Sequence, residues 1–137
     1  MTNYKKFLYW EDIAQYDLET AQALLDAHRY LYVVFMCQQT IEKLVKGLYV
    51  LYNGNDPAKT HNINFIFSTI RWGNTSKHFS SKVSDYKRFF VVLRSYYIAQ
   101  RYPLYDEKLS TSLDRKEAFE VLEKTKEVFS WLISLKK

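Results

Sequence analysis

The centre of this chain reads Cys37-Gln-Gln-Thr-Ile-Glu-Lys-Leu-Val-Lys46, inside a longer run of mostly apolar and aromatic residues. Gln38, Glu42 and Lys46 recur at every fourth position, so on a helix they form one polar stripe. The other positions predict a wide apolar arc, which is typical of a helix at the centre of a fold. Such a helix must either hide its polar stripe against polar partners or present it to a ligand.

Working outward, helical periodicity extends this segment to Tyr30–Tyr52 and predicts further helices on both sides. They run from Trp10 to Ala27, from Ile63 to Ile70, from Ser84-Asp85 to about Arg101, and from Leu113-Asp114 to the C-terminus. The chain from Tyr102 to Thr111 is expected to be an extended link after the break at Pro103. These elements predict an all-α fold, an up-and-down bundle of four long helices plus one short helix, and a single domain over residues 1–137.

Four signals set the expected helix ends. His28-Arg29 is expected to be a short joint, and Asn53-Gly54 to stop the second helix. Ser84-Asp85 is expected to cap the fourth helix at its N-terminus. Asp114, with Glu117 three residues later, resembles a capping box at the start of the last helix.

The composition narrows the class of protein. Only 3 glycines and 2 prolines occur in 137 residues, which favours helices with few joints over a turn-rich β-fold. Cys37 is the only cysteine, so no internal disulfide forms, and its apolar helical position predicts a buried free thiol in a reducing compartment. No signal peptide and no apolar run of about 18 residues is visible, so we expect a soluble, cytoplasmic protein with no membrane segment. The 12 tyrosines suit either the seams of a bundle or an interface.

Positive charge is concentrated in one part of the chain. The net charge is +5, and residues 71–101 hold seven cations but one acid, Asp85, whereas the remainder holds 13 cations and 14 acids. Aromatic residues alternate with these cations, an arrangement that suits the phosphates and bases of RNA. The alternative is a solvated basic face over an aromatic core.

Two constellations are candidates for a site. The first is the stripe Gln38, Glu42 and Lys46, whose alternative role is structural, since a Glu followed by Lys four residues later stabilises a helix by about 0.2–0.5 kcal/mol. The second is the stretch Arg94-Ser-Tyr-Tyr-Ile-Ala-Gln-Arg-Tyr-Pro103, in which Arg94, Tyr97 and Arg101 share a helical face. A guanidinium fixed at a helix end is a good phosphate ligand, although an ion pair with Glu42, Asp106 or Glu107 is an alternative.

Other kinds of site are not indicated. His61 has no Cys or His companions at metal-ligand spacing, so we expect no metal. The chain shows no glycine-rich nucleotide loop and no nucleophile–base arrangement, so we expect no cofactor. His61 is expected to satisfy a loop, and His28 to stand at a helix end.

Taken in order, several residues resemble the HEPN domain of small prokaryotic proteins. They are Trp10, Asp17-Leu18 and Ala21 in the first helix, Gln39 to Lys46 in the second, His61 before the third, and Arg101-Tyr-Pro103 before the last. The resemblance covers roughly Trp10 to Leu132. It implies a helical bundle that forms a homodimer and pairs with a minimal nucleotidyltransferase, often as a toxin–antitoxin couple. Many members are metal-independent ribonucleases.

The nuclease motif of that family is an Arg and, after four to six residues, a His. Arg101 matches the Arg, but Asp106 stands where the His is expected, and Lys108 where toxins that are modified by their partner carry Tyr. An aspartate beside basic residues is a poor proton carrier near neutral pH, so both departures argue against RNA cleavage. Arg71 and His78 match the spacing, but they lie in a polar loop before the fourth long helix.

The sequence thus leaves three hypotheses. The preferred one is a non-catalytic or weakly catalytic homodimer that associates with a nucleotidyltransferase. It binds RNA or a nucleotide in a cleft lined by Arg94, Tyr97, Arg101 and Tyr102 and facing the stripe Gln38, Glu42 and Lys46. The second is a ribonuclease that uses Arg101 with Asp106, or Arg71 with His78. The third is a non-catalytic protein-interaction module whose tyrosines form the seam.

Overall fold

The computed structural model describes residues 1–73, 81–101, 105 and 108–136, without the side chains of residues 100 and 101. The elements are α1 (Asn3–Asp26), α2 (Tyr30–Asn53), α3 (Ile63–Ser68), α4 (Val83–Arg101), a 3-10 turn η2 (Leu109–Thr111) and α5 (Arg115–Ser134). Within these ranges the chain has no strand. The prediction of an all-α bundle with four long helices and one short helix is therefore confirmed.

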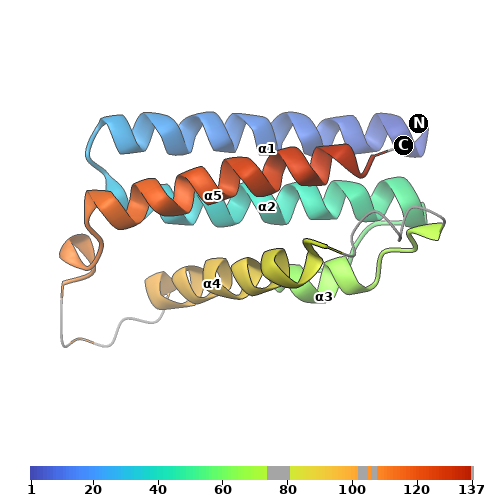
Figure 1. The fold of residues 1–137 in the computed structure, drawn as a ribbon. Helices are drawn as coiled ribbons and strands as arrows, with labels where there is room; N and C mark the ends of the chain where they lie inside the picture. Colours follow the sequence, from blue (N-terminus) through green and yellow to red (C-terminus); the bar gives the residue numbers. More distant parts are fainter. Residues whose placement is uncertain (74–80, 102–104, 106–107, 137) are drawn as a thin grey trace.

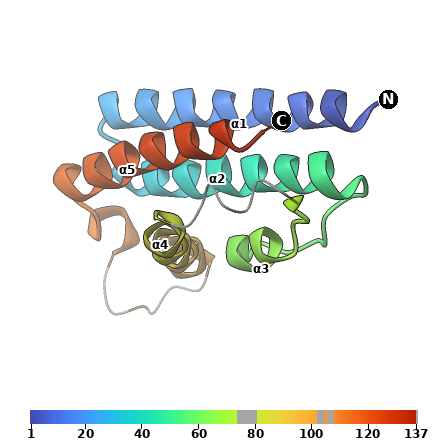
Figure 2. The same cartoon turned by 45° about the vertical axis from the view of Figure 1, so that its right-hand side comes forward.

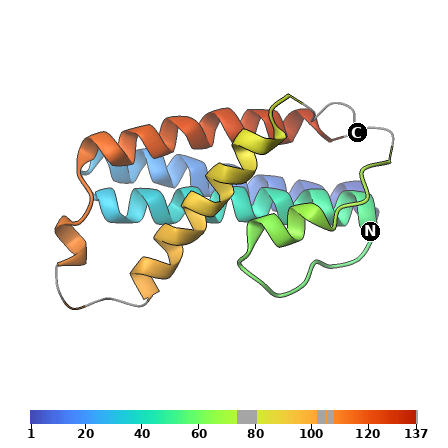
Figure 3. The same ribbon diagram turned by 60° about the horizontal axis from the view of Figure 1, so that its bottom comes forward.

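Helix α2 is the centre of the bundle. It packs against α1, α5, α4 and α3. Figure 1 shows α1 on one side, α2 and α5 in the middle, and α3 with α4 on the other side. The view in Figure 2 keeps this order and separates α3 from α4. In Figure 3, α4 crosses α2 and α5 obliquely. The central position of α2 explains its apolar arc. Eight apolar residues of this helix are 0% exposed: Val33, Val34, Cys37, Ile41, Leu44, Val45, Leu48 and Val50.

The contact between α1 and α2 depends on a glycine. A Cβ atom built on Gly47 would lie 2.6 Å from the Cβ atom of Trp10 and 3.2 Å from the ring of Phe7. Real Cβ atoms do not approach that closely, so the two helices lie near each other because residue 47 lacks a side chain. The long apolar contact also buries Phe7, Ala14, Ala21 and Leu25 of α1.

Several predicted boundaries are confirmed. The α1–α2 joint falls at His28-Arg29, with His28 at φ 63°. Gly54 ends α2 with φ 84° and a bond from its N–H to the carbonyl of Val50. Asp114 caps α5, its Oδ1 accepting from the N–H of Glu117 at 2.9 Å. Cys37 is buried as a free thiol, as its position predicts.

Other boundaries differ from the sequence predictions. Helix α1 begins at Asn3 rather than near Trp10, because the Thr2 hydroxyl accepts from the N–H of Lys5 and caps it. Helix α4 already begins at Val83, with the N–H of Tyr86 bonded to the carbonyl of Lys82, so the predicted Ser84-Asp85 cap is wrong. Helix α3 ends at Ser68, two residues early.

The predicted link from Tyr102 to Thr111 is described only in part, and η2 occupies its end as a helical turn rather than an extended segment.

The tyrosines divide between the two roles that the sequence allowed. Three tie helices together through their hydroxyls, which donate to the carbonyl of Leu135 and to the carboxylates of Glu127 and Glu117: Tyr52, Tyr86 and Tyr96. Four others among the described residues are more than half exposed on the outer surface: Tyr9, Tyr16, Tyr32 and Tyr105.

Candidate functional site

The polar stripe of α2 is a buried hydrogen-bonded chain. Gln38 is 0% exposed and Glu42 is 3% exposed. The Nε2 of Gln38 donates to Oε1 of Glu42 at 2.8 Å, and the Nζ of Lys46 donates to Oε2 at 3.0 Å. Gln39 in turn donates to the side-chain oxygen of Gln38 at 2.7 Å. A carboxylate this deeply buried is costly unless hydrogen-bond donors surround it. Gln38 and Lys46 supply such donors to Glu42 from the same helix.

A fourth residue reaches the same carboxylate from outside the helix. The Nδ1 of His61 lies 3.1 Å from Oε1 and 3.2 Å from Oε2 of Glu42. Since Glu42 is in an ion pair with Lys46 and acts as acceptor, we assign the imidazole proton to Nδ1, which leaves Nε2 on the outer side. The side chain of His61 is 53% exposed, in contrast to 4% for Glu42. A buried anion thus orients an accessible imidazole.

The local sequence explains why His61 reaches Glu42. Gly54 ends α2, and the chain then returns along it to α3. Asn62 caps α3, its Oδ1 accepting from the N–H of Phe65 at 3.2 Å, and the hydroxyl of Thr60 accepts from the N–H of Asn62. These two bonds fix the backbone on both sides of His61.

Helix α4 supplies an aromatic wall. Tyr97 is 6% exposed, and its ring centroid lies 4.8 Å from that of His61 at an interplanar angle of 35°. Phe35 of α2 also stacks on Tyr97, with centroids 6.0 Å apart and an angle of 13°. Side chains of α2 and α4 therefore meet at the His61 imidazole, in the segment before α3.

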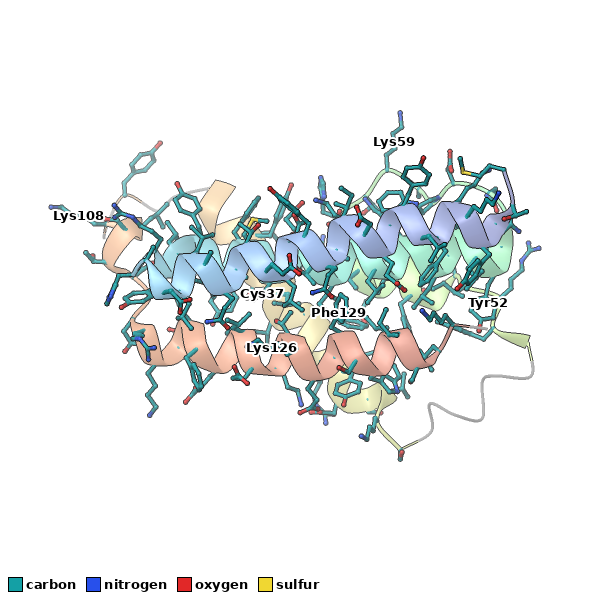
Figure 4. The ribbon with its side chains drawn as sticks, turned by 90° about the horizontal axis from the view of Figure 1, so that it is seen from above. Cys37, Tyr52, Lys59, Lys108, Lys126 and Phe129 are labelled. Atoms are coloured by element: carbon teal, nitrogen blue, oxygen red, sulfur yellow. The ribbon has the colours of Figure 1, made fainter. Side chains whose placement is uncertain are left out.

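An open pocket of about 470 Å³ lies in front of this arrangement. It is lined by Lys59, Thr60, His61, Asn62, Arg94, Tyr97 and Ile98. Lys59 and Arg94 are both exposed, and Figure 4 shows Lys59 projecting outward from the loop before α3. None of the lining residues is acidic, and within the part of the chain that the structure describes Arg94 forms no ion pair. The pocket thus combines two cations, Lys59 and Arg94, with an oriented imidazole and the apolar side chain of Ile98. These features suit a phosphate attached to a flat base.

Two of the residues predicted for binding, Arg94 and Tyr97, line this pocket. The stripe Gln38, Glu42 and Lys46 lies behind the pocket and does not line it. It is linked to the pocket through the contact between Glu42 and the exposed His61. The Arg101 side chain, Tyr102, Asp106 and His78 lie outside the described residues. The backbone N–H of Arg71 donates to Asn53, which holds the end of α2.

The contact between His61 and Glu42 was not predicted from the sequence. From the sequence, His61 was expected to satisfy a loop, and an arginine was the expected partner of Glu42. A usable signal is nevertheless present, because a buried Glu with one Lys on its own helix still needs further donors, and His61 is one of several polar residues just before α3.

A nucleophilic role for the neighbouring Cys37 is disfavoured. Burial raises the pKa of its thiol to about 12, although the Thr125 hydroxyl and Lys126 act in the opposite direction. The reactive thiolate is therefore scarce at neutral pH. Figure 4 shows Cys37 inside the bundle, between α1 and α5.

Neither a metal centre nor a membrane span is found in the described ranges. No three His, Cys, Asp or Glu side chains there are grouped as metal ligands. No helix there combines the length and apolarity needed to cross a bilayer.

Comparison with known proteins finds one matching domain family and similar solved structures. The HEPN domain matches residues 7–136. In structure, the chain is similar to TT1696 from Thermus thermophilus, with 25% identity, a TM-score of 0.77, and coverage of 95% of this chain and 98% of that one. It also has the fold of ST0689, an archaeal HEPN homologue, with 22% identity, a TM-score of 0.73, and coverage of 96% and 98%. No curated protein sequence matches significantly.

Proposed function

The chain belongs to the HEPN domain family, and from that premise we propose that it binds RNA or a nucleotide in the pocket between residues 59–62, which precede α3, and α4. The observation that carries the proposal is the pairing of an exposed His61 with a buried Glu42 beside Arg94 and Tyr97. In this proposal Arg94 and Lys59 contact phosphate oxygens. The His61 and Tyr97 side offers a surface for a base or a ribose.

The electrostatics of the pocket favour an anion over a cation or a neutral ligand. Lys59 and Arg94 line it, and the carboxylate behind it, Glu42, is already bonded to Lys46 and Gln38. An incoming phosphate therefore meets positive charge at the rim, and the buried negative charge behind it is compensated. Guanidinium is the stronger of the two rim ligands, because it offers two parallel N–H donors to phosphate.

Arg101 and Tyr102 extend the proposed site. Arg101 is the last residue of α4, seven positions after Arg94 and four after Tyr97. We include Arg101 because residues at that spacing share a helical face, and Tyr102 because it follows Arg101 in the sequence. Gln38, Glu42 and Lys46 are assigned to orient His61 rather than to touch the ligand.

The oligomeric state, the partner and the location that we propose are carried over from the family. They are a homodimer, association with a minimal nucleotidyltransferase in a toxin–antitoxin type of pair, and a cytoplasmic location. The ribonuclease motif is degenerate, since Asp106 stands in place of its His, so we propose a binding role without cleavage. The alternatives are a ribonuclease that acts through Arg101 with Asp106, or through Arg71 with His78, and a protein-interaction module.

The test is the affinity of the purified chain for a short fluorescent single-stranded RNA and for ATP, followed by anisotropy and by calorimetry. Arg94→Ala should weaken binding about tenfold, since a hydrogen bond to a charged group contributes about 1.5–3 kcal/mol. For RNA it should also lower the salt dependence by about 0.7 in the log–log slope. Arg101→Ala should act in the same direction.

Arg115→Ala is the matched control, because it removes another exposed cation, at the start of α5 and outside the lining of the pocket. Equal losses in Arg94→Ala and Arg115→Ala would mean that RNA binds by net charge alone, and the pocket assignment would be wrong. Cleavage of the same RNA by the wild-type chain, abolished in Arg101→Ala, would instead favour the ribonuclease alternative.

A further inference from the structure

A groove lies beside the proposed pocket, where α3 packs against α4. Its volume is about 550 Å³, and in Figure 3 both helices lie on the side turned toward the viewer. Its lining includes Asn62, Asn64, Phe65, Lys87, Arg88 and Val91. Since Asn62 also lines the pocket, the groove and the pocket are neighbours along α4.

The groove carries positive charge without a lining acid. Lys87 and Arg88 are both exposed, and Asp85, earlier on α4, is paired with Lys124 of α5. The Nζ of Lys87 lies 5.9 Å from the centre of the Phe67 ring. Arg88, in contrast, forms no ion pair within the part of the chain that the structure describes. Arg88 is therefore the cation of the groove that is best placed to bind an anion.

An exposed aromatic ring stands beside these cations. Phe65 of α3 is 51% exposed and Val91 of α4 is 59% exposed, and both line the groove. The backbone that carries them is fixed, because Asn62 accepts from the N–H of Phe65 at 3.2 Å and the Nδ2 of Asn64 donates to the carbonyl of Lys87 at 3.1 Å. A ring held next to cations is the combination on which nucleic-acid bases stack.

The spacing of the cations on α4 favours a ligand with more than one phosphate. Lys87, Val91 and Arg94 stand at i, i+4 and i+7, so they share one face of the helix. At 1.5 Å per residue, Lys87 and Arg94 are about 10.5 Å apart along the helix axis. Lys87 lines the groove and Arg94 lines the pocket, and neither lines both. A nucleoside monophosphate offers one phosphate to the pocket, whereas a strand places successive phosphates along both.

We propose that the groove is a second binding position for a single strand of RNA whose first position is the pocket. The inference rests on the proposed function and selects an RNA strand over a free nucleotide as its ligand. Arg88 and Lys87 contact another phosphate of the strand than the one bound by Arg94, and Phe65 stacks on a base. That base is unpaired, because a base inside a duplex does not offer its face to a side chain.

The affinities for a fluorescent single-stranded RNA of about eight nucleotides and for AMP, from anisotropy and calorimetry, test the groove. Arg88→Ala should weaken RNA binding about tenfold, since a hydrogen bond to a charged group is lost, and should leave the affinity for AMP unchanged. Phe65→Ala should act in the same way through the lost stacking. Both side chains are exposed, so both variants should keep the circular dichroism spectrum of the wild type. Arg115→Ala, outside the groove and the pocket, is again the matched control.

The possible results separate failure of the groove from failure of the pocket. An unchanged RNA affinity in Arg88→Ala, with a loss in Arg94→Ala, would overturn the groove and keep the pocket. Equal losses in Arg88→Ala and Arg115→Ala would also overturn it, because RNA would then bind by net charge. A duplex that binds as tightly as the single strand would contradict the stacking on Phe65. An Arg94→Ala variant that binds AMP and RNA like the wild type would overturn the pocket itself.

Discussion

Replacing Glu42 by glutamine is the most informative perturbation of the buried network. The change keeps the size of the side chain and removes its charge. Three donors, from Gln38, Lys46 and His61, now meet one amide oxygen and an NH₂ group that is itself a donor. Lys46, 14% exposed, loses its only carboxylate partner among the described residues.

The expected cost is about 3 kcal/mol in the free energy of unfolding. Breaking a buried ion pair from one side costs about 3–5 kcal/mol, and the lower end applies because Lys46 keeps some contact with water. For a domain of this size that corresponds to a fall in Tm of about 10 °C. Urea unfolding followed by circular dichroism measures it. Glu120→Gln, on the exposed side of α5, is the matched control, with an expected change within about 0.5 kcal/mol.

A double variant separates the ion pair from general damage to the helix. Lys46→Met should cost less in the Glu42→Gln background than in the wild type, because the methionine removes the charge that the first change left unpaired. A loss below about 1 kcal/mol for Glu42→Gln, or strict additivity of the two changes, would refute the reasoning. The Nδ1 contact of His61 would then be incidental.

Three further predictions concern other parts of the fold. The raised pKa of Cys37, about 12 against a usual 9.0, stabilises the folded state fully below pH 9, and this contribution is lost as the pH rises. Denaturant titrations should show the free energy of unfolding falling by about 1 kcal/mol between pH 9 and pH 10, and by clearly less in Cys37→Ala. Gly47→Ala should cost about 1–3 kcal/mol in urea unfolding, since its Cβ would meet Trp10 at 2.6 Å; no loss would mean that α1 shifts freely. Asp114→Ala should cost about 1 kcal/mol, as the cap of α5 is lost, and Asp114→Asn should restore most of it.

The fold was largely predictable from sequence because local signals agreed. The apolar arc of α2, the glycine stop at Gly54 and the cap at Asp114 all indicated helices that the structure contains. The start of α1 was missed because Asn3 to Tyr9 mixes charged and aromatic residues. A capping hydroxyl at Thr2, rather than periodicity, begins that helix.

The site was predictable only in part, because it depends on contacts between distant segments. The spacing of Gln38, Glu42 and Lys46 indicated the stripe, and the spacing of Arg94 and Tyr97 indicated one wall of the pocket. Nothing in local sequence determined the return of the chain that places His61 beside Glu42, 19 residues away.

The central claim is that an anionic ligand occupies the pocket in front of the His61 imidazole. Titration of the isotope-labelled chain with AMP, followed by NMR of the histidine ring and arginine side-chain signals, tests it most directly. We expect the signals of His61 and Arg94 to shift first and to saturate together, whereas those of His28 and Arg115 stay in place. Saturable binding that leaves both the His61 ring and the Arg94 guanidinium unchanged would contradict it.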